Sequence, residues 1–375
     1  MSEAVSFRVE HQDGTARAGV LATPHGAVST PAFMPVGTRG TVRALDSRDL
    51  AEVGARMVLA NTYHLMLRPG AETVAALGGL HGFMAWEGPI LTDSGGYQVL
   101  SLEPRVDEDG VAFRSAYDGA KVRLTPEGAV AVQEQLGPDI AMILDVPVAL
   151  PAPADRVRRA MERTLRWAER AREAHTRPDQ ALFGIVQGGT DPEMRAESAA
   201  ATAALGFAGF GIGGLAVGET PEERHQALEA AVAALPPGRV RYVMGLGDTE
   251  GVLAAVGQGC DLFDCVWPTR LARHGKVLSA RGDYSVRRAE LAEAGEPIDS
   301  DCPCLTCRRY SLGYLRHLRV TGELLGMRLL SIHNLTYTLG LLDGARRAVA
   351  AGKYAAYCES VRARRRTRHS RGRLP

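Results

Sequence analysis

The chain has 375 residues, of which 45% are hydrophobic and 23% are charged, a composition sufficient for one large domain or a domain with an appendage. No uncharged apolar run approaches the ~18 residues that a membrane-spanning helix requires, so we expect no membrane partner. The first residues lack the basic-then-apolar pattern of a secretory signal, and we therefore expect a cytoplasmic protein.

The net charge of +1 conceals a strong asymmetry along the chain. Residues 302–375 contain 15 Lys or Arg and 3 Asp or Glu, a balance of +12, which leaves −11 for residues 1–301. A basic end on an acidic body is typical of a protein that holds a polyanionic partner by that end. A solvated basic tail without a partner is the alternative.

In chain order, the first predicted elements are short alternating segments within residues 6–34. Asp13-Gly14 and His25-Gly26 interrupt these segments, and such pairs favour tight turns between antiparallel strands. We expect the resulting hairpins to cap one end of the domain that follows.

A regular alternation of apolar runs and amphipathic stretches comes next, between about residues 35 and 270. The helical stretches are clearest at 154–175, 191–205, 221–235 and 248–258. Eight short β-type runs separated by helices indicate an α/β fold, a (β/α)8 barrel of the TIM type, with a doubly wound open sheet as the alternative. The runs lie at 42–45, 57–60, 90–93, 140–145, 182–187, 209–214, 242–247 and 262–266. An insertion at 103–122, with a turn at Asp109-Gly110, follows the third run.

Polar residues stand at the ends of several of these runs. Asp93, Asp145 and Asp264 end or nearly end the third, fourth and eighth runs, and Gln187 and Gly214 end the fifth and sixth. Because a barrel of this type carries its active site at the carboxyl ends of its strands, these residues should share one rim. Any single aspartate there has the alternative role of a helix N-cap, but three such caps explain the pattern poorly.

This set of residues indicates a specific chemistry. Two carboxylates across a small pocket suit nucleophilic and acid/base attack at an anomeric carbon. The third, with Gln187 and the backbone N–H of Gly214, offers acceptors and donors that match the edge of a purine. Tyr97 and Met244 have side chains that suit packing against the flat faces of a base.

Five long motifs in this order resemble the bacterial form of the tRNA-guanine transglycosylase family, and the match runs from about residue 6 to residue 360 without a large gap. The motifs are Asn61-Thr62-Tyr63-His64-Leu65-Met66-Leu67-Arg68-Pro69-Gly70, Asp93-Ser94-Gly95-Gly96-Tyr97-Gln98, Phe183-Gly184-Ile185-Val186-Gln187-Gly188, Gly213-Gly214-Leu215-Ala216-Val217-Gly218 and Phe263-Asp264-Cys265-Val266-Trp267-Pro268-Thr269-Arg270. The bacterial form is favoured because the chain has no room after its cysteine cluster for the long C-terminal region of archaeal members.

The resemblance implies a role for each strand-end residue. Asp264 is the expected nucleophile, which attacks the ribose anomeric carbon and holds the RNA covalently, and Asp93 is the expected acid/base. The expected base-binding residues are Asp145, Gln187, Gly214, Ser94, Tyr97 and Met244. No nucleotide cofactor is expected, because one glycosidic bond is exchanged for another.

The resemblance also implies the substrates: the wobble guanine of tRNA anticodons and a 7-deazaguanine base. Val217, a branched side chain beside Gly214, favours 7-aminomethyl-7-deazaguanine (preQ1) over the bulkier queuine, because queuine should clash there. Where bacterial members are expected to have Glu-Cys after the recognition aspartate, this chain has Val146-Pro147, which keeps queuine open as an alternative. Family members dimerise, so a homodimer is expected.

The cysteine spacing predicts a metal centre. Three of the six cysteines, Cys302, Cys304 and Cys307, lie within six residues, unlike a disulfide framework, and His333 follows after 25 residues. Three thiolates and one imidazole make a closed tetrahedral set for one structural Zn²⁺. Cys265, beside Asp264, is either a packed or a reactive thiol.

The metal set completes a predicted division of the chain. We expect an N-terminal β cap at 1–34, the catalytic barrel at 35–284, a zinc-binding subdomain at 285–345, and a C-terminal helix with a basic tail at 346–375. Arg270 and Arg273, directly after the nucleophile, are the expected RNA-binding residues. Arg308, Arg309, Arg316 and the arginine-rich run 362–373 would extend this footprint.

Two other functions fit parts of the pattern less well. A metal-dependent hydrolase on the same barrel needs clustered histidine ligands, commonly His-x-His after the first strand, and the ten histidines include no such pair. A non-catalytic, zinc-containing RNA-binding subunit should lack one of the catalytic aspartates, whereas Asp93 and Asp264 are both present.

Overall fold

The computed structural model describes residues 4–100, 102 and 104–371. Glu103, where the predicted insertion begins, and Arg373, where the predicted arginine run ends, lie outside the described residues. Within the described part, no helix combines the length and the apolar content needed to cross a membrane.

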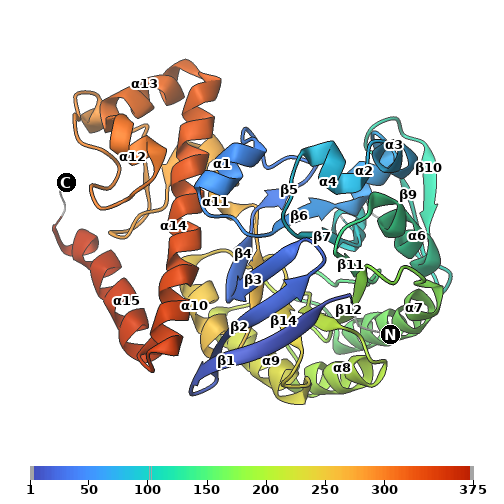
Figure 1. Cartoon of the computed structure of the whole chain (residues 1–375). Coiled ribbons are helices and arrows are strands. Elements are labelled where there is room, and N and C mark those ends of the chain that lie inside the picture. The colour runs from blue at the N-terminus through green and yellow to red at the C-terminus, as the bar shows by residue number, and fades with distance from the viewer. Residues whose placement is uncertain (1–3, 101, 103, 372–375) are drawn as a thin grey trace.

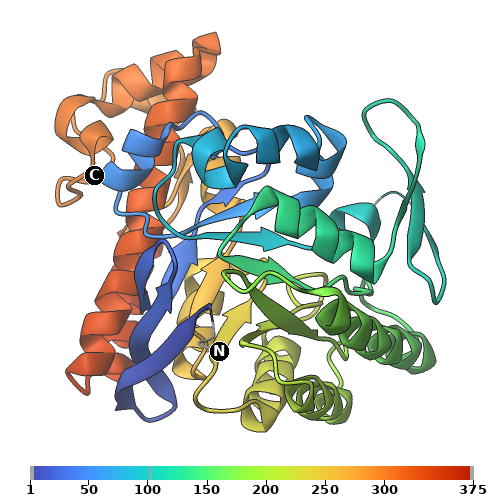
Figure 2. The ribbon, with the colours of Figure 1, turned by 45° about the vertical axis from the view of Figure 1, so that its right-hand side comes forward.

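The central sheet is a closed parallel barrel surrounded by helices (Figures 1 and 2). The strand order is β4 (Ala32–Met34), β15 (Leu262–Asp264), β14 (Val240–Val243), β13 (Gly209–Ile212), β12 (Ala181–Val186), β11 (Ile140–Met142), β7 (Ile90–Asp93), β6 (Val58–Asn61), β5 (Val36–Gly37). Because only Pro35 separates β4 from β5, the two ends of this order form one interrupted strand. The barrel therefore consists of eight strands, which we call staves and number in chain order, with β4 and β5 together as the first. The predicted (β/α)8 fold is confirmed.

The first stave is not where the sequence pattern placed it. Residues 42–45, predicted as the first strand, form a turn in which Leu45 N–H donates to Val42 O at 2.9 Å and Ala44 has φ 67°. The run is apolar because Val42 and Leu45 are buried beneath that turn. The true first strand is cut at Pro35, which lacks the N–H that a ladder needs, and this interruption hides the strand from a pattern search.

Helices connect the staves, and the four predicted most clearly are confirmed: α7 (Ala154–Ala174), α8 (Pro192–Ala204), α9 (Pro221–Ala234) and α10 (Thr249–Gly257). The side chains of Asp191, Thr220 and Asp248 cap the N-termini of α8, α9 and α10, which fixes where each begins. The remaining barrel helices are α1 (Ser47–Glu52), α2 (Thr62–Leu67), α3 (Ala71–Ala76), α4 (Gly79–Met84), α5 (Gly96–Leu100), α6 (Pro126–Leu136) and α11 (Trp267–Arg273).

The N-terminal residues form the expected antiparallel cap, a sheet of β1 (Ser6–Asp13), β2 (Ala16–Thr23) and β3 (Gly26–Thr30). Two buried aspartates fasten it to the barrel. Asp261, directly before β15, receives two bonds from the guanidinium of Arg17, and Asp139, directly before β11, accepts from the backbone N–H of His25. Because both aspartates precede their strands, the cap covers the amino end of the barrel and leaves the carboxyl rim free.

The insertion after the third stave is a small antiparallel sheet of β8 (Arg105–Val106), β9 (Val111–Arg114) and β10 (Lys121–Leu124). Its predicted turn is confirmed, since Asp107 N–H donates to Gly110 O across it. This sheet projects from the body of the barrel in Figure 2.

The C-terminal part forms a lobe beside the barrel and two long helices (Figure 1). The lobe contains β16 (Lys276–Val277), β17 (Tyr284–Ser285), a 3-10 turn at Ala289–Leu291, α12 (Leu305–Arg309) and α13 (Leu312–Thr321). Helix α14 (Leu324–Ala350) leads from the lobe along the barrel, where it contacts α11, β4 and the cap, and α15 (Tyr354–Arg371) packs against it. The four-part division of the chain stays a prediction.

Candidate active site and metal centre

The carboxyl rim of the barrel carries every strand-end residue that the sequence singled out. Asp93 is the last residue of β7 and Asp264 the last residue of β15, whereas Asp145 follows β11 by three residues. Gln187 comes directly after β12, and Gly214 lies two residues beyond β13.

Asp93 is held by donors from the end of β6 and from its own loop. One carboxylate oxygen accepts from Asn61 Nδ2 at 2.5 Å, and the other accepts from the backbone N–H of Thr62 at 3.0 Å and of Gly95 at 3.2 Å. Burial raises the pKa of Asp93 to about 7, and the charge of Asp264 adds to the rise despite these donors. A carboxyl that titrates near neutrality can both give and take a proton there.

Asp264 has two donors of its own on a single oxygen. Oδ1 accepts from the Tyr242 hydroxyl at 2.6 Å and from the Gly245 N–H at 2.7 Å. Burial raises the pKa of Asp264, and these two donors oppose that rise. Burial and the nearby Asp264 charge hold the pKa of Tyr242 well above its usual value, so this hydroxyl remains a donor. Oδ2 is left without a hydrogen bond among the described residues.

Asp145 and Gln187 form a buried pair. Gln187 Nε2 donates to Asp145 Oδ2 at 2.7 Å, and Ser94 Oγ lies 3.5 Å from Oδ1. Burial raises the pKa of Asp145 to about 6. Gly214 has φ 67°, and a Cβ at this position would collide with Gln187 Oε1, so only glycine fits beside the amide.

Two buried charged residues that the sequence did not single out support this half of the rim. The Arg195 guanidinium donates to the backbone carbonyls of residues 186, 189, 213 and 214, at 2.7 to 3.3 Å. The Glu219 carboxylate accepts from the backbone N–H groups of Ala216 and Val217. Together they fix the loop that carries Gly214. A lone arginine or glutamate inside a helical or loop pattern gives no signal of such a role.

The remaining predicted site residues lie around these groups. Tyr97, on α5, is 62% exposed, and Met244 is half-buried directly after β14. A Cβ on Gly213 would lie 3.4 Å from the Met244 sulfur, which places Met244 near the base of the Gly214 loop. Arg270 and Arg273 lie on α11, which follows Asp264. Cys265 is largely buried, and burial raises the pKa of its thiol to about 11, which favours the packed over the reactive reading.

The predicted metal ligands converge in the lobe. Cys302, Cys304, Cys307 and His333 present their ligand atoms within 4.8 Å of one another. His333 Nδ1 lies 3.3 to 3.7 Å from the three sulfurs, while its Nε2 lies 2.8 Å from Leu278 O. A ring held by its far nitrogen is the usual arrangement of a metal-binding histidine. The Cys3His set therefore fits a metal ion and is compatible with zinc.

A second cluster of potential ligands, His25, His81 and Asp139, lies at the amino end of the barrel. Both oxygens of Asp139 already carry two neighbours each: Oδ1 the N–H and ring of His25, and Oδ2 the Ile90 N–H and the His81 ring. The two imidazoles are stacked with centroids 3.6 Å apart. This arrangement is that of a hydrogen-bonded clamp between cap and barrel.

Fold and site together define a class of protein: a TIM-barrel enzyme that acts at a glycosidic bond, with a separate metal-binding lobe. The family model described as queuine tRNA-ribosyltransferase matches residues 12–367. Curated proteins of that name are similar over nearly their whole length. One from Thermus thermophilus is 50% identical over 361 residues (96% of this chain, 94% of the relative), and the one from Gloeobacter violaceus is 51% identical over 361 residues (95% and 96%). That of Herpetosiphon aurantiacus is 49% identical over 356 residues (94% and 91%).

The chain belongs to the queuine tRNA-ribosyltransferase family and is thus a glycosyltransferase of the tRNA-guanine transglycosylase type.

Proposed function

We propose that this enzyme replaces the wobble guanine of tRNA anticodons with preQ1, through a covalent bond between Asp264 and the ribose. The observation that supports this most is the pair of strand-end carboxylates, Asp264 with a free oxygen and Asp93 with a pKa of about 7. The two differ in their surroundings in the way that a nucleophile and a proton carrier must differ.

The proposed reaction has two matched halves. In the first, Asp264 Oδ2 attacks C1′ of the ribose, the bond from C1′ to guanine N9 breaks, and Asp93 gives its proton to the departing base. In the second, Asp93 takes the N9 proton of the incoming base, whose nitrogen attacks C1′ and releases the Asp264 carboxylate. The Tyr242 hydroxyl and the Gly245 N–H hold Oδ1 throughout, which keeps Oδ2 pointed at the reaction.

The base is recognised on the other half of the rim. The Asp145 carboxylate accepts the donors of the guanine pyrimidine ring, while the Gln187 amide and the Gly214 N–H address its carbonyl. Ser94 supports Asp145 from the side opposite Gln187, and Tyr97 and Met244 cover the two faces. The exposed position of Tyr97 on α5 agrees with a ring that has no packing partner until a base enters.

The choice of preQ1 over queuine rests on Val217. Its backbone is fixed by Glu219, so its branched side chain cannot readily retreat from a bulky 7-substituent. Val146, where the sequence departs from the expected pattern, is buried with its N–H bonded to Thr164 Oγ1. A competition assay offers each free base with tRNA and follows released guanine. Faster turnover with queuine would show that Val217 does not control the pocket.

We propose that one Zn²⁺ per chain occupies the Cys3His set and is structural, since all four positions of a tetrahedral ion are filled by protein ligands. The ion would take no part in the reaction and would only hold α12 against α14.

We also propose that the chain works as a homodimer. A row of stacked rings, from directly after α12 onto α13, supports this: the centroids of Tyr310 and Tyr314 are 5.6 Å apart, and those of Tyr314 and His317 are 6.5 Å apart. Tyr314 is 41% exposed, and the nearby Val320 and Leu324 are 55% and 76% exposed. An exposed apolar surface of this kind is typical of an interface.

The test of the function is guanine exchange. The wild-type chain is incubated with tRNA and radiolabelled guanine, and label is counted in the RNA. We expect incorporation by the wild type and none by Asp264→Ala, which should still bind tRNA. A denaturing gel tests the covalent step: an RNA–protein adduct formed by Asp264→Ala would assign the nucleophile to another residue.

A further inference from the structure

An aromatic side chain on the inserted hairpin lies within cation–π distance of two arginines. The Cζ atoms of Arg39 and Arg68 lie 5.3 Å and 4.9 Å from the ring centroid of Tyr117. The Tyr117 hydroxyl lies 2.9 Å from His64 Nδ1, and the neighbouring Ala116 N–H donates to the Tyr63 hydroxyl. The hairpin loop is therefore docked on α2, and Tyr117 holds both guanidinium groups by cation–π contact.

The three residues lie on one sector of the active rim. Arg39 follows β5, Arg68 ends α2 after β6, and Tyr117 belongs to the insertion after β7. These three strands are neighbours in the barrel, in the order β7, β6, β5. The sector thus extends from Asp93, at the end of β7, toward the seam where β4 meets β15 and Asp264.

The same sector continues in more arginines. Arg43 lies in the turn after Arg39. Burial of Arg273, on α11, is the main cause that lowers the pKa of Arg273, and the charges of Arg43 and Arg270 lower it further. Among the described residues, none of these five arginines has a carboxylate oxygen within ion-pair distance; the pKa of Asp118 is lowered mainly by its hydrogen bond with Ser115 and only slightly by the charge of Arg68. By contrast, the base-recognition residues follow β11, β12 and β13, on the other side of the rim.

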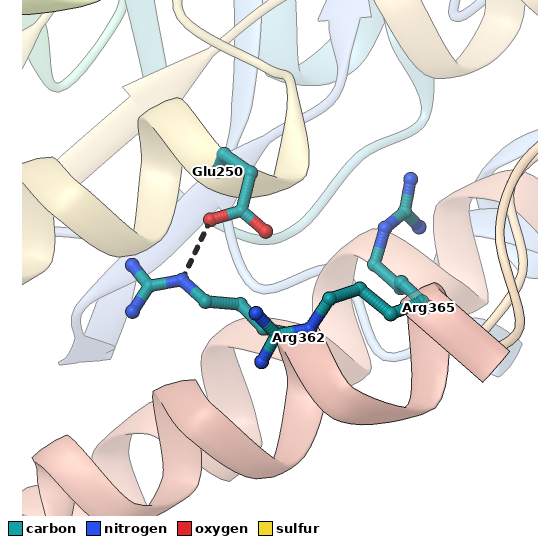
Figure 3. A pocket seen from close by; sticks show the side chains of 4 residues that line it. Glu250, Arg362 and Arg365 are labelled. Atoms are coloured by element: carbon teal, nitrogen blue, oxygen red, sulfur yellow. Dashed lines mark hydrogen bonds and ion pairs between the residues drawn. The ribbon is translucent and has the colours of Figure 1, made fainter. Parts of the chain in front are cut away.

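The basic C-terminal helix behaves differently. Its arginines line an open groove of about 330 Å³ with Glu250 of α10, shown in Figure 3. There Arg362 pairs with Glu250 and Glu359, Arg365 with Asp283, and Arg366 with Glu359. These charges are already neutralised within the chain and tie α15 to the barrel. Uncompensated positive charge near the active aspartates lies instead on the Arg39 sector.

We propose that Arg39, Arg68 and Tyr117 form a binding site for one backbone phosphate of the RNA substrate, next to the nucleotide whose base is exchanged. This inference rests on the proposed function. Guanidinium groups bind phosphate oxygens through paired N–H donors, and their stacking on Tyr117 fixes them in advance, which lowers the entropic cost of binding. RNA thus enters with its backbone over this sector and its base directed across the rim to Asp145.

The test measures binding of a labelled anticodon stem–loop RNA to the full chain by fluorescence anisotropy, at several salt concentrations. Arg39→Ala and Arg68→Ala should each weaken binding, roughly threefold to tenfold, and should lower the slope of log affinity against log salt by about 0.7 to 1. Arg159→Ala, which removes an exposed arginine paired with Asp155 on the outer helix α7, is the matched control. Tyr117→Ala should weaken binding more than Tyr117→Phe, which keeps the ring.

A second arm locates the phosphate. Stem–loops carrying one neutral methylphosphonate in place of a phosphate are compared in turn, and at one position the penalty of Arg68→Ala should vanish. The proposed site would be overturned if both arginine variants kept the wild-type RNA affinity and the wild-type slope of log affinity against log salt. It would also be overturned if Arg68→Ala lost affinity equally for every stem–loop with a neutral linkage. Guanine exchange by the wild type is measured separately. If the wild type exchanges guanine and the variants bind RNA as the wild type does, only the proposed phosphate site is refuted.

Discussion

Asp93 and Asp264 share burial but not partners. Asp93 faces two donors from the Asn61–Thr62 segment, one from Gly95 in its own loop, and the charge of Asp264, whereas Asp264 has the Tyr242 hydroxyl and a backbone N–H on one oxygen. This difference supports the proposed roles of Asp93 as the proton carrier and Asp264 as the nucleophile.

The rate of guanine release should therefore depend on pH through Asp93. The carboxyl must be protonated when the base departs, and its pKa is raised to about 7. Single-turnover formation of the RNA–protein adduct should fall about tenfold per pH unit above that value, and it should also decline at acidic pH, where the Asp264 nucleophile becomes protonated. Asp93→Asn should lose both the rate and the pH dependence. A rate that rises from pH 7 to pH 9 would contradict the assignment.

Tyr242 is expected to be a positioning residue for the nucleophile. Tyr242→Phe removes a hydrogen bond to a charged group, worth about 1.5 to 3 kcal/mol, and leaves the ring in the core. Adduct formation should slow roughly ten- to hundredfold while tRNA affinity stays within about twofold. A fall in RNA affinity that accounts for the whole loss would instead mean a structural effect.

The sequence could place the aspartates but not their supports. Asp93 and Asp264 end apolar runs, and this pattern predicts a strand-end carboxylate. Tyr242 stands inside such a run and is indistinguishable from a core residue, and Arg195 stands on an ordinary helix. The partners of these side chains come from strands and loops far away in the chain, which periodicity does not encode.

At the scale of elements, the loop between β13 and α9 is the part of the site that depends most on buried charge. Arg195, from α8, binds carbonyls of both the β12 and the β13 loops, and its full burial lowers its pKa to about 9. The helix thus acts as a brace between two neighbouring loops.

Replacing Arg195 with Met should leave several buried carbonyls unpaired and lower the free energy of unfolding by about 3 kcal/mol or more. Arg195→Lys keeps the charge with fewer donors and should fold. In that variant the KM for guanine should rise more than kcat falls, because the Gly214 loop is displaced while Asp264 is not. Urea unfolding and steady-state exchange measure the two effects. An equal loss in kcat with unchanged KM would argue against a role in base binding.

The elements themselves were largely predictable. The helices after the fourth to seventh staves were found because amphipathic stretches alternate there with short apolar runs. The first strand was missed since its two pieces are three and two residues long around Pro35, too short for any pattern, and the nearby buried turn imitated a strand.

At the scale of the whole molecule, the metal centre lies outside the barrel strands. The four ligands belong to the lobe and the first half of α14, and no strand of the barrel supplies one. Freshly purified protein should contain one zinc per chain by elemental analysis. Cys307→Ser should lose the metal and make the lobe sensitive to protease.

In the same Cys307→Ser protein, the barrel should keep most of its far-ultraviolet circular dichroism, because none of its strands supplies a metal ligand. Wild-type protein without zinc, or a variant that unfolds as one unit with the barrel, would show that this separation is wrong.

The interruption of the first stave at Pro35 has a consequence for the order in which the barrel assembles. The first stave can pair on its free side only with β15, whose residues 262–264 are synthesised more than two hundred positions later, and α14 then covers the join from residue 324 onward. While the chain emerges from the ribosome, it carries an open sheet with two unpaired edges, each a template for wrong partners. The split strand, whose two pieces have only three and two residues, forms one of these edges, which shortens the exposed template on the side that waits longest.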